Sequence, residues 1–74
     1  MKAILEFNLP EEKEEFDLAV QSSNMHHTLW EMDQWLRGKI KYASDDIDEN
    51  TYKTYEECRE QLRQFANENN IDLN

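Results

Sequence analysis

A row of polar and aromatic side chains at helical spacing contains the residues of this sequence that are most suited to binding or to chemistry. His26, Trp30, Asp33 and Arg37 follow one another at intervals of four, three and four residues, so in a helix they share one edge. In one interpretation the row borders a core, and Arg37 forms an i,i+4 ion pair that neutralises a half-buried Asp33. In the other it is a recognition face, because Trp and Arg are enriched among residues that dominate binding energy.

Trp35 lies on the other flank of the same predicted helix. Two Trp side chains in a chain of 74 residues are difficult to bury together, so at least one is expected at a surface contact. The candidate interaction face predicted from the sequence comprises five residues: His26, Trp30, Asp33, Trp35 and Arg37.

Two residue patterns are typical of metal sites, and both are incomplete. His27 and Glu31 are one helical turn apart and could bind one ion, but two ligands do not form a site. Part of the spacing of an EF-hand calcium loop recurs in four residues: Asp46, Asp48, Asn50 and Glu57. Thr51 stands where such a loop needs glycine. We therefore predict no bound metal ion and no other cofactor.

Motifs for catalysis are also missing. The chain has no nucleophile motif and no zinc pattern of cysteines, and its single glycine excludes a glycine-rich phosphate loop. Because 17 of the 74 residues are Asp or Glu, a pair of carboxylates carries little information. The sequence predicts no catalytic residue, and we expect a protein that is not an enzyme.

The elements that would position these residues are one strand and three helices. Alternation of side chains predicts a short strand over residues 2–8. Helices are predicted over about 10–21, 24–42 and 51–69, from a proline and capping residues at helix starts and from apolar residues at helical spacing. The predicted fold class is α+β, mostly helical, with residues 1–74 forming one small domain.

Two apolar stripes are expected to form the core. The predicted central helix carries the longer one: Met25, Leu29, Met32, Leu36 and Ile40. The last helix carries the other: Tyr55, Cys58, Leu62 and Phe65. We expect the first and last helices to pack on the central stripe, with Ser22, Ser23 or Asn24 capping the start of the central helix.

Size and charge limit the classes of function. With a net charge of −9, the chain is not expected to bind nucleic acid directly. Cys58 is the only cysteine, which excludes an internal disulfide and fits a cytoplasmic location. No run of residues is long and apolar enough to span a bilayer. Because so small a chain has a small core, we expect a homodimer that adds buried surface.

Three blocks of sequence are similar to those of a known family: LEFNLPEEKEEFDLAV, LWEMDQWLRGKIKY and CREQLRQFANENNIDL. The most specific pattern lies in the second block and consists of six residues: Leu29, Trp30, Asp33, Trp35, Leu36 and Arg37. Together the blocks resemble a family of small uncharacterised acidic proteins encoded by tailed bacteriophages and prophages. The resemblance covers most of the chain except residues 43–50. It implies a phage origin and a location in the host-cell cytoplasm, but no mechanism.

The function that we expect is that of a non-enzymatic phage accessory protein that acts by protein–protein interaction and modulates an unknown host or phage protein. A first alternative is an acidic mimic of nucleic acid, which would compete for a host DNA-binding protein. A second alternative is a metal-binding module or a small enzyme. The salt dependence of binding distinguishes the expected interaction protein from the acidic mimic. Binding by a mimic weakens steeply as ionic strength rises, whereas binding through an aromatic contact does not.

Overall fold

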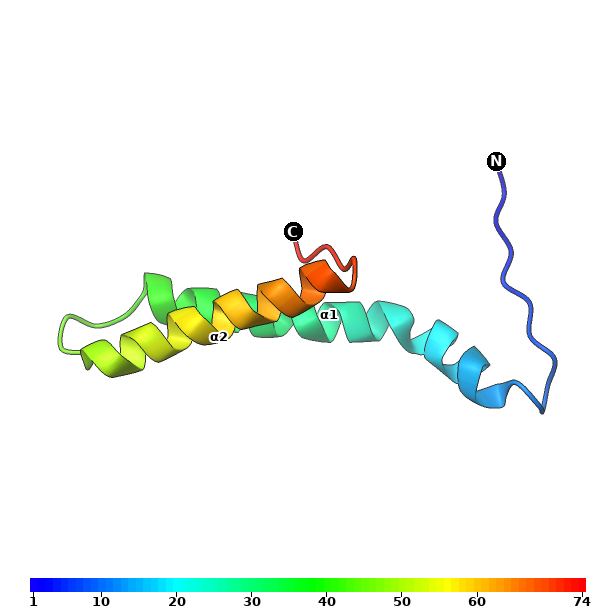
Figure 1. Ribbon diagram of the computed structural model, residues 1–74, viewed down its shortest axis with the longest axis horizontal. Coiled ribbons are helices and arrows are strands. Elements are labelled where there is room, and N and C mark those ends of the chain that lie inside the picture. Colours follow the sequence, from blue (N-terminus) through cyan, green and yellow to red (C-terminus); the bar gives the residue numbers. More distant parts are fainter.

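Two long helices form an antiparallel hairpin (Figure 1). α1 spans Lys13–Lys41 and α2 spans Glu49–Glu68, in a computed structural model that covers residues 1–74. The molecule is elongated, with extents of 56 × 28 × 19 Å, and the N-terminal part of α1 projects beyond the end of α2 (Figure 1). No strand is present, so the predicted α+β fold class is wrong and the fold is all-helical.

α1 is continuous across the predicted boundary between two helices, 10–21 and 24–42. The residues expected to cap a new helix, 22–24, lie inside α1. The hydroxyl of Ser22 donates a hydrogen bond to the carbonyl of Ala19 at 2.8 Å, so this polar side chain bonds to its own helix instead. No proline lies within α1, and the backbone therefore keeps its helical hydrogen bonds through this region.

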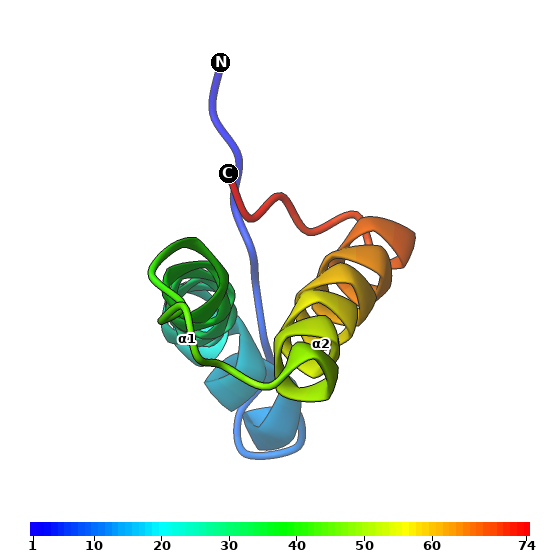
Figure 2. The ribbon, with the colours of Figure 1, turned by 90° about the vertical axis from the view of Figure 1, so that its left-hand side faces the viewer.

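Residues 2–8, predicted as a strand, form no backbone pairing with another segment and run away from the hairpin (Figures 1 and 2). Their only internal partner would have been Ile71–Leu73, and that segment lies against the hairpin instead. The N-terminal segment touches α1 where the rings of Phe7 and Phe16 meet edge to face, with 5.9 Å between centroids. Alternating side chains predict a single strand, but they do not show whether a second strand is present to pair with it, and a lone strand is not stable.

α2 begins at Glu49, slightly before the predicted range of 51–69, because Asp48 caps it. The carboxylate of Asp48 accepts a hydrogen bond from the backbone N–H of Thr51 at 3.2 Å, which satisfies one free donor of the first turn. The start of the helix is thus determined by an acidic side chain of the connecting segment.

The C-terminal residues 69–74 fold back from α2 toward α1 (Figure 2). Asn70 has a φ of 58°, the left-handed conformation in which helices commonly end. After this turn the N–H of Ile71 donates to the carbonyl of Ala66 at 2.8 Å. The chain end therefore covers part of the groove between the two helices.

The core of the hairpin is small. Three apolar side chains are buried, one each from α1, α2 and the tail: Leu36, Ala66 and Leu73. Of the predicted central stripe only Leu36 is buried, whereas Met25 and Met32 are about half exposed. The predicted packing of three helices is wrong because the first predicted helix is the projecting end of α1, where it has no neighbouring helix (Figure 1).

Candidate interaction surface

Asp33 has no exposed surface and joins the two helices near the middle of the hairpin. Its carboxylate accepts hydrogen bonds from Arg59, at 3.1 Å from Nε and 3.4 Å from Nη2, and from Arg63, at 2.9 Å from Nη1. The predicted pair with Arg37 does not form. Two guanidinium groups on the facing helix give Asp33 three charge-assisted hydrogen bonds. A single exposed arginine on its own helix could not provide as many.

Burial and the two arginines act on the pKa of Asp33 in opposite directions. Burial raises the pKa of this carboxyl, but the hydrogen bonds and positive charges of Arg59 and Arg63 together lower it below its ordinary value of 3.8. Asp33 is therefore ionised at neutral pH. No buried side-chain nitrogen or oxygen lacks a hydrogen-bond partner, so the cluster is fully satisfied. Asp33 serves as an anion that holds the helices together.

Sequence reasoning missed the partners of Asp33, although one signal was present. Arg59 and Arg63 are like charges one helical turn apart, next to the apolar stripe of α2. Like charges at this spacing repel unless an anion lies between them. A pair of arginines beside a stripe of apolar residues thus indicates a carboxylate on the opposing element.

The C-terminal tail is held at two points, one on each helix. Nη2 of Arg63 donates to Oδ1 of Asn74 at 2.8 Å, and Nε2 of His26 hydrogen-bonds the carbonyl of Asp72. Leu73 stands between Asp72 and Asn74 in the sequence, and its side chain is buried. The tail is therefore an integral part of the hairpin.

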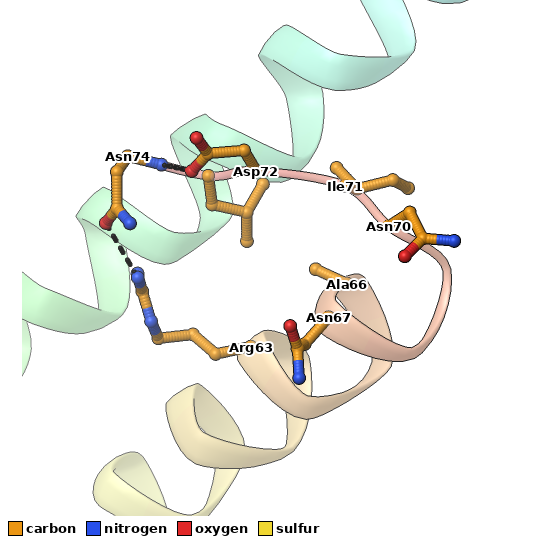
Figure 3. Close-up of a pocket in the computed structure, with 8 residues that line it drawn as sticks. Arg63, Ala66, Asn67, Asn70, Ile71, Asp72 and Asn74 are labelled. Atoms are coloured by element: carbon orange, nitrogen blue, oxygen red, sulfur yellow. Dashed lines mark hydrogen bonds between the residues drawn. The ribbon is translucent and has the colours of Figure 1, made fainter.

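A pocket of about 500 Å³ lies between the tail and the end of α2 (Figure 3). Arg63 is its only cationic side chain, and this group is already bonded to Asp33 and Asn74. The carboxylate of Asp72, its only acid, accepts a hydrogen bond from the N–H of Asn74 at 2.9 Å. The only cation of the pocket is thus committed within the protein, and its only acid is held by a backbone hydrogen bond at one of its two oxygens.

The structure does not bring the five predicted interface residues together. Asp33 is buried, and His26 holds the tail. Trp30 and Arg37 are exposed on an edge of α1 away from Trp35, which lies five residues from Trp30 and thus about 140° around the helix. Of the five, Trp35 alone belongs to a larger apolar surface.

That surface runs along one edge of the hairpin. We define the apolar face by seven residues, three from α1 and four from α2: Met25, Met32, Trp35, Tyr55, Cys58, Leu62 and Phe65. The rings of Trp35 and Tyr55 meet edge to face at 6.1 Å between centroids, which joins the two helices' contributions. Trp35 is 54% exposed and Phe65 56%. Part of the predicted core stripe of α2 is therefore surface.

The apolar face lies away from the acidic residues of α2, and the nearest acid of α1 is Glu31, one turn before Trp35, with its Oε1 2.7 Å from Nε2 of His27. Helical spacing places uncharged side chains such as Thr28 and Thr51 on the same edge of the hairpin as the apolar face. This edge also carries one cation, Lys39, whose Nζ lies 5.2 Å from the centroid of the Trp35 ring. The acids Glu56 and Glu60 of α2 lie on the other edge, where they line a pocket that includes Arg59 and Arg63. The hairpin thus has one apolar edge and one charged edge.

A second group of exposed apolar residues lies in the N-terminal part, outside the hairpin: Ile4, Leu5, Leu9, Leu18 and Val20. Six acidic residues share residues 1–24 with them. Only Leu18 lies on the edge of α1 that carries Met25 and Met32, so it extends the apolar face past the end of α2.

No family model matches the chain, and comparisons with curated proteins and with solved structures find no significant similarity. Neither helix contains the apolar stretch that would be needed to cross a membrane. No three His, Cys, Asp or Glu side chains are grouped so that they could hold a metal ion. The surface itself therefore carries the functional argument.

Proposed function

We propose that this chain is a non-enzymatic interaction protein whose apolar face binds another protein. One observation carries the proposal: Met32, Trp35 and Phe65 are all about half exposed on an edge of the hairpin to which α2 contributes no acid, in a chain of net charge −9. Exposed apolar patches with a polar rim are typical of protein interaction sites. Trp at the centre of such a patch is among the residues that contribute most to binding energy.

The partners proposed for this face are a second copy of the chain and a host or phage protein. The resemblance to small phage proteins supports the role of a phage accessory protein in the host cytoplasm that modulates a host factor. The net charge of −9 supports selectivity, because it repels acidic proteins and favours the approach of basic ones.

Two observations support a role without catalysis. The charged groups in the pocket beside the tail are already bonded within the protein. The thiol of Cys58 is exposed and forms no hydrogen bond with a basic side chain that could activate it.

The test compares two Trp variants in full-length tagged protein. Trp35→Ala removes the largest side chain of the apolar face. Trp30→Ala removes an equally large side chain from another edge, where it stacks on His27 at 5.7 Å between centroids. We expect the wild type and Trp30→Ala to retain a partner from infected-host lysate at high salt, and Trp35→Ala to lose it with helicity unchanged. Loss with Trp30→Ala and retention with Trp35→Ala would show that the other edge binds.

A specific observation also favours acidic mimicry as a second candidate. Glu56, Glu57 and Glu60 are exposed on α2, and none of them forms an ion pair. Such a row of free carboxylates could compete with phosphates for a DNA-binding protein. In that case the captured protein is released between low and high salt, and Trp35→Ala has no effect on capture.

A further inference from the structure

The apolar stripe of α1 is longer than the part of α1 that α2 covers. Leu18, Met25 and Met32 repeat at seven-residue intervals, and Leu29 and Leu36 interleave with them. A repeat of this kind is typical of a helix that packs along its length against other helices. Yet Leu18 is 57% and Met32 51% exposed, because α2 and the tail contact only one side of the stripe. The exposed side of the stripe is therefore suited to packing against another helix.

The chain exposes more area than a compact chain of the same mass. Its accessible surface is 6592 Å², whereas a compact chain of 9.0 kDa would expose about 4,900 Å². The excess of roughly 1,700 Å² includes the N-terminal segment that runs away from the hairpin as well as the apolar face, and about 800 Å² suffices for one side of a standard interface. The radius of gyration, 17.6 Å against about 11 Å for a compact domain of this length, agrees with this excess.

Charge limits where two copies could meet. Two chains of net charge −9 repel each other, so contact between copies needs a surface without carboxylates. The apolar face comes closest to this condition, because the acids of α2 lie on the opposite edge or on its outer side, and Glu31 of α1, one turn before Trp35, points its Oε1 to Nε2 of His27 at 2.7 Å. The charged edge and the acidic N-terminal part do not meet it. The same surface on both copies can then pair with itself, as a two-fold interface demands.

We propose that a second copy of this chain covers the apolar face, so that two hairpins pair into a four-helix bundle. This inference rests on the proposed function, since it names the occupant of the same surface. Trp35 and Phe65 lie in the interface between the hairpins. Met25 and Met32, about half exposed in the single chain, become buried there as a second layer of the interface. The charged edges face water on both sides of the bundle.

The first experiment measures the mass of the purified full-length chain by sedimentation equilibrium over a range of concentrations. We expect twice the 9.0 kDa of one chain for the wild type. Met32→Glu places an acid in the apolar face, and the dissociation constant of the dimer should rise about 30-fold or more. Gln34→Glu is the matched control, because it adds the same charge two residues away on another edge of α1 and should leave the dimer intact.

A second measurement uses the wild type alone and does not depend on the folding of a variant. Cys58 is the only thiol and lies on the apolar face, where it is exposed in the single chain. Its rate of reaction with a bulky maleimide should fall as protein concentration rises through the dimer midpoint. A monomeric mass at all concentrations, or a dimer in which Cys58 reacts at the same rate as in the monomer, overturns the inference. Capture of another protein that Trp35→Ala abolishes would still uphold the proposed function.

Discussion

Oδ2 of Asp33 in α1 lies 2.9 Å from Nη1 of Arg63 in α2, and Arg63 in turn bonds to Asn74 at the end of the chain. This relay links both helices and the tail through side chains alone. Arg59 adds a second cation on the same carboxylate, 3.1 Å away. Three segments that are distant in the sequence thus depend on one buried anion, and the stability of the hairpin should be sensitive to it.

Replacing Asp33 should destabilise the hairpin strongly. Asp33→Ala leaves two arginines without their anion, and loss of one partner of a buried pair costs about 3 kcal/mol or more in free energy of unfolding. Urea unfolding followed by circular dichroism measures this change. Asp17→Ala removes an exposed pair with Lys13 and should change the free energy of unfolding by less than about 1 kcal/mol. Equal effects of the two variants would contradict the role assigned to Asp33.

The same carboxylate should make stability depend on pH in acid. The folded-state pKa of Asp33 lies below its ordinary value of 3.8, so folding favours the ionised form. This contribution is fully present above the unfolded-state pKa, and it is lost as pH falls through the lower folded-state pKa. Other carboxylates also titrate there, so the difference between wild type and Asp33→Asn isolates the effect. That difference should be constant near neutral pH and shrink below about pH 4. A difference that stays constant down to pH 2 would contradict it.

The tail should contribute to the stability of the hairpin as a packed element. Leu73 is 4% exposed, and Leu73→Ala should cost about 2–3 kcal/mol in free energy of unfolding through lost apolar contact. Ile4→Ala removes a side chain of similar size from the exposed N-terminal segment and should have almost no effect. Thermal unfolding of the two variants at one protein concentration provides the comparison. A Leu73→Ala variant as stable as the wild type would show that the tail is not packed.

Local signals in the sequence predicted several elements correctly. The break between the helices predicted to end at residue 42 and to begin at residue 51 is present, as is the helix that follows it. Such features depend on a few neighbouring residues, and so they can be predicted from short patterns. Lys39 and Lys41 lie in the last turn of α1, where cations interact favourably with the helix dipole.

Features that depend on distant partners were not predictable in this way. The strand at 2–8 required a second strand, and the spacing of Asp33 and Arg37 could not show that Arg59 and Arg63 lie closer. The apolar stripes were recognised, but periodicity does not say what covers a stripe. Trp35 is 54% exposed, and its contact with Tyr55 depends on how the two helices pack, which the sequence does not show.

The boundary predicted at residues 22–24 leads to the last prediction. If two helices met there, proline at position 23 would fall in the first turn of the second helix and be tolerated. In a continuous α1, Ser23→Pro removes a helical hydrogen bond and clashes with the carbonyl of Ala19, which costs about 3 kcal/mol. The projecting turns before it lack a neighbouring helix to offset this cost, and short isolated helices are marginal.

Residues 13–22 should therefore lose helicity in Ser23→Pro, while the hairpin from residue 24 onward remains folded. Circular dichroism measures the lost helix, and amide hydrogen exchange locates it. Ser23→Ala is the matched control and should keep or slightly raise the helical content, because Ala has the higher helix propensity. Unchanged exchange rates over residues 13–22 in Ser23→Pro would mean that a joint between two helices exists after all.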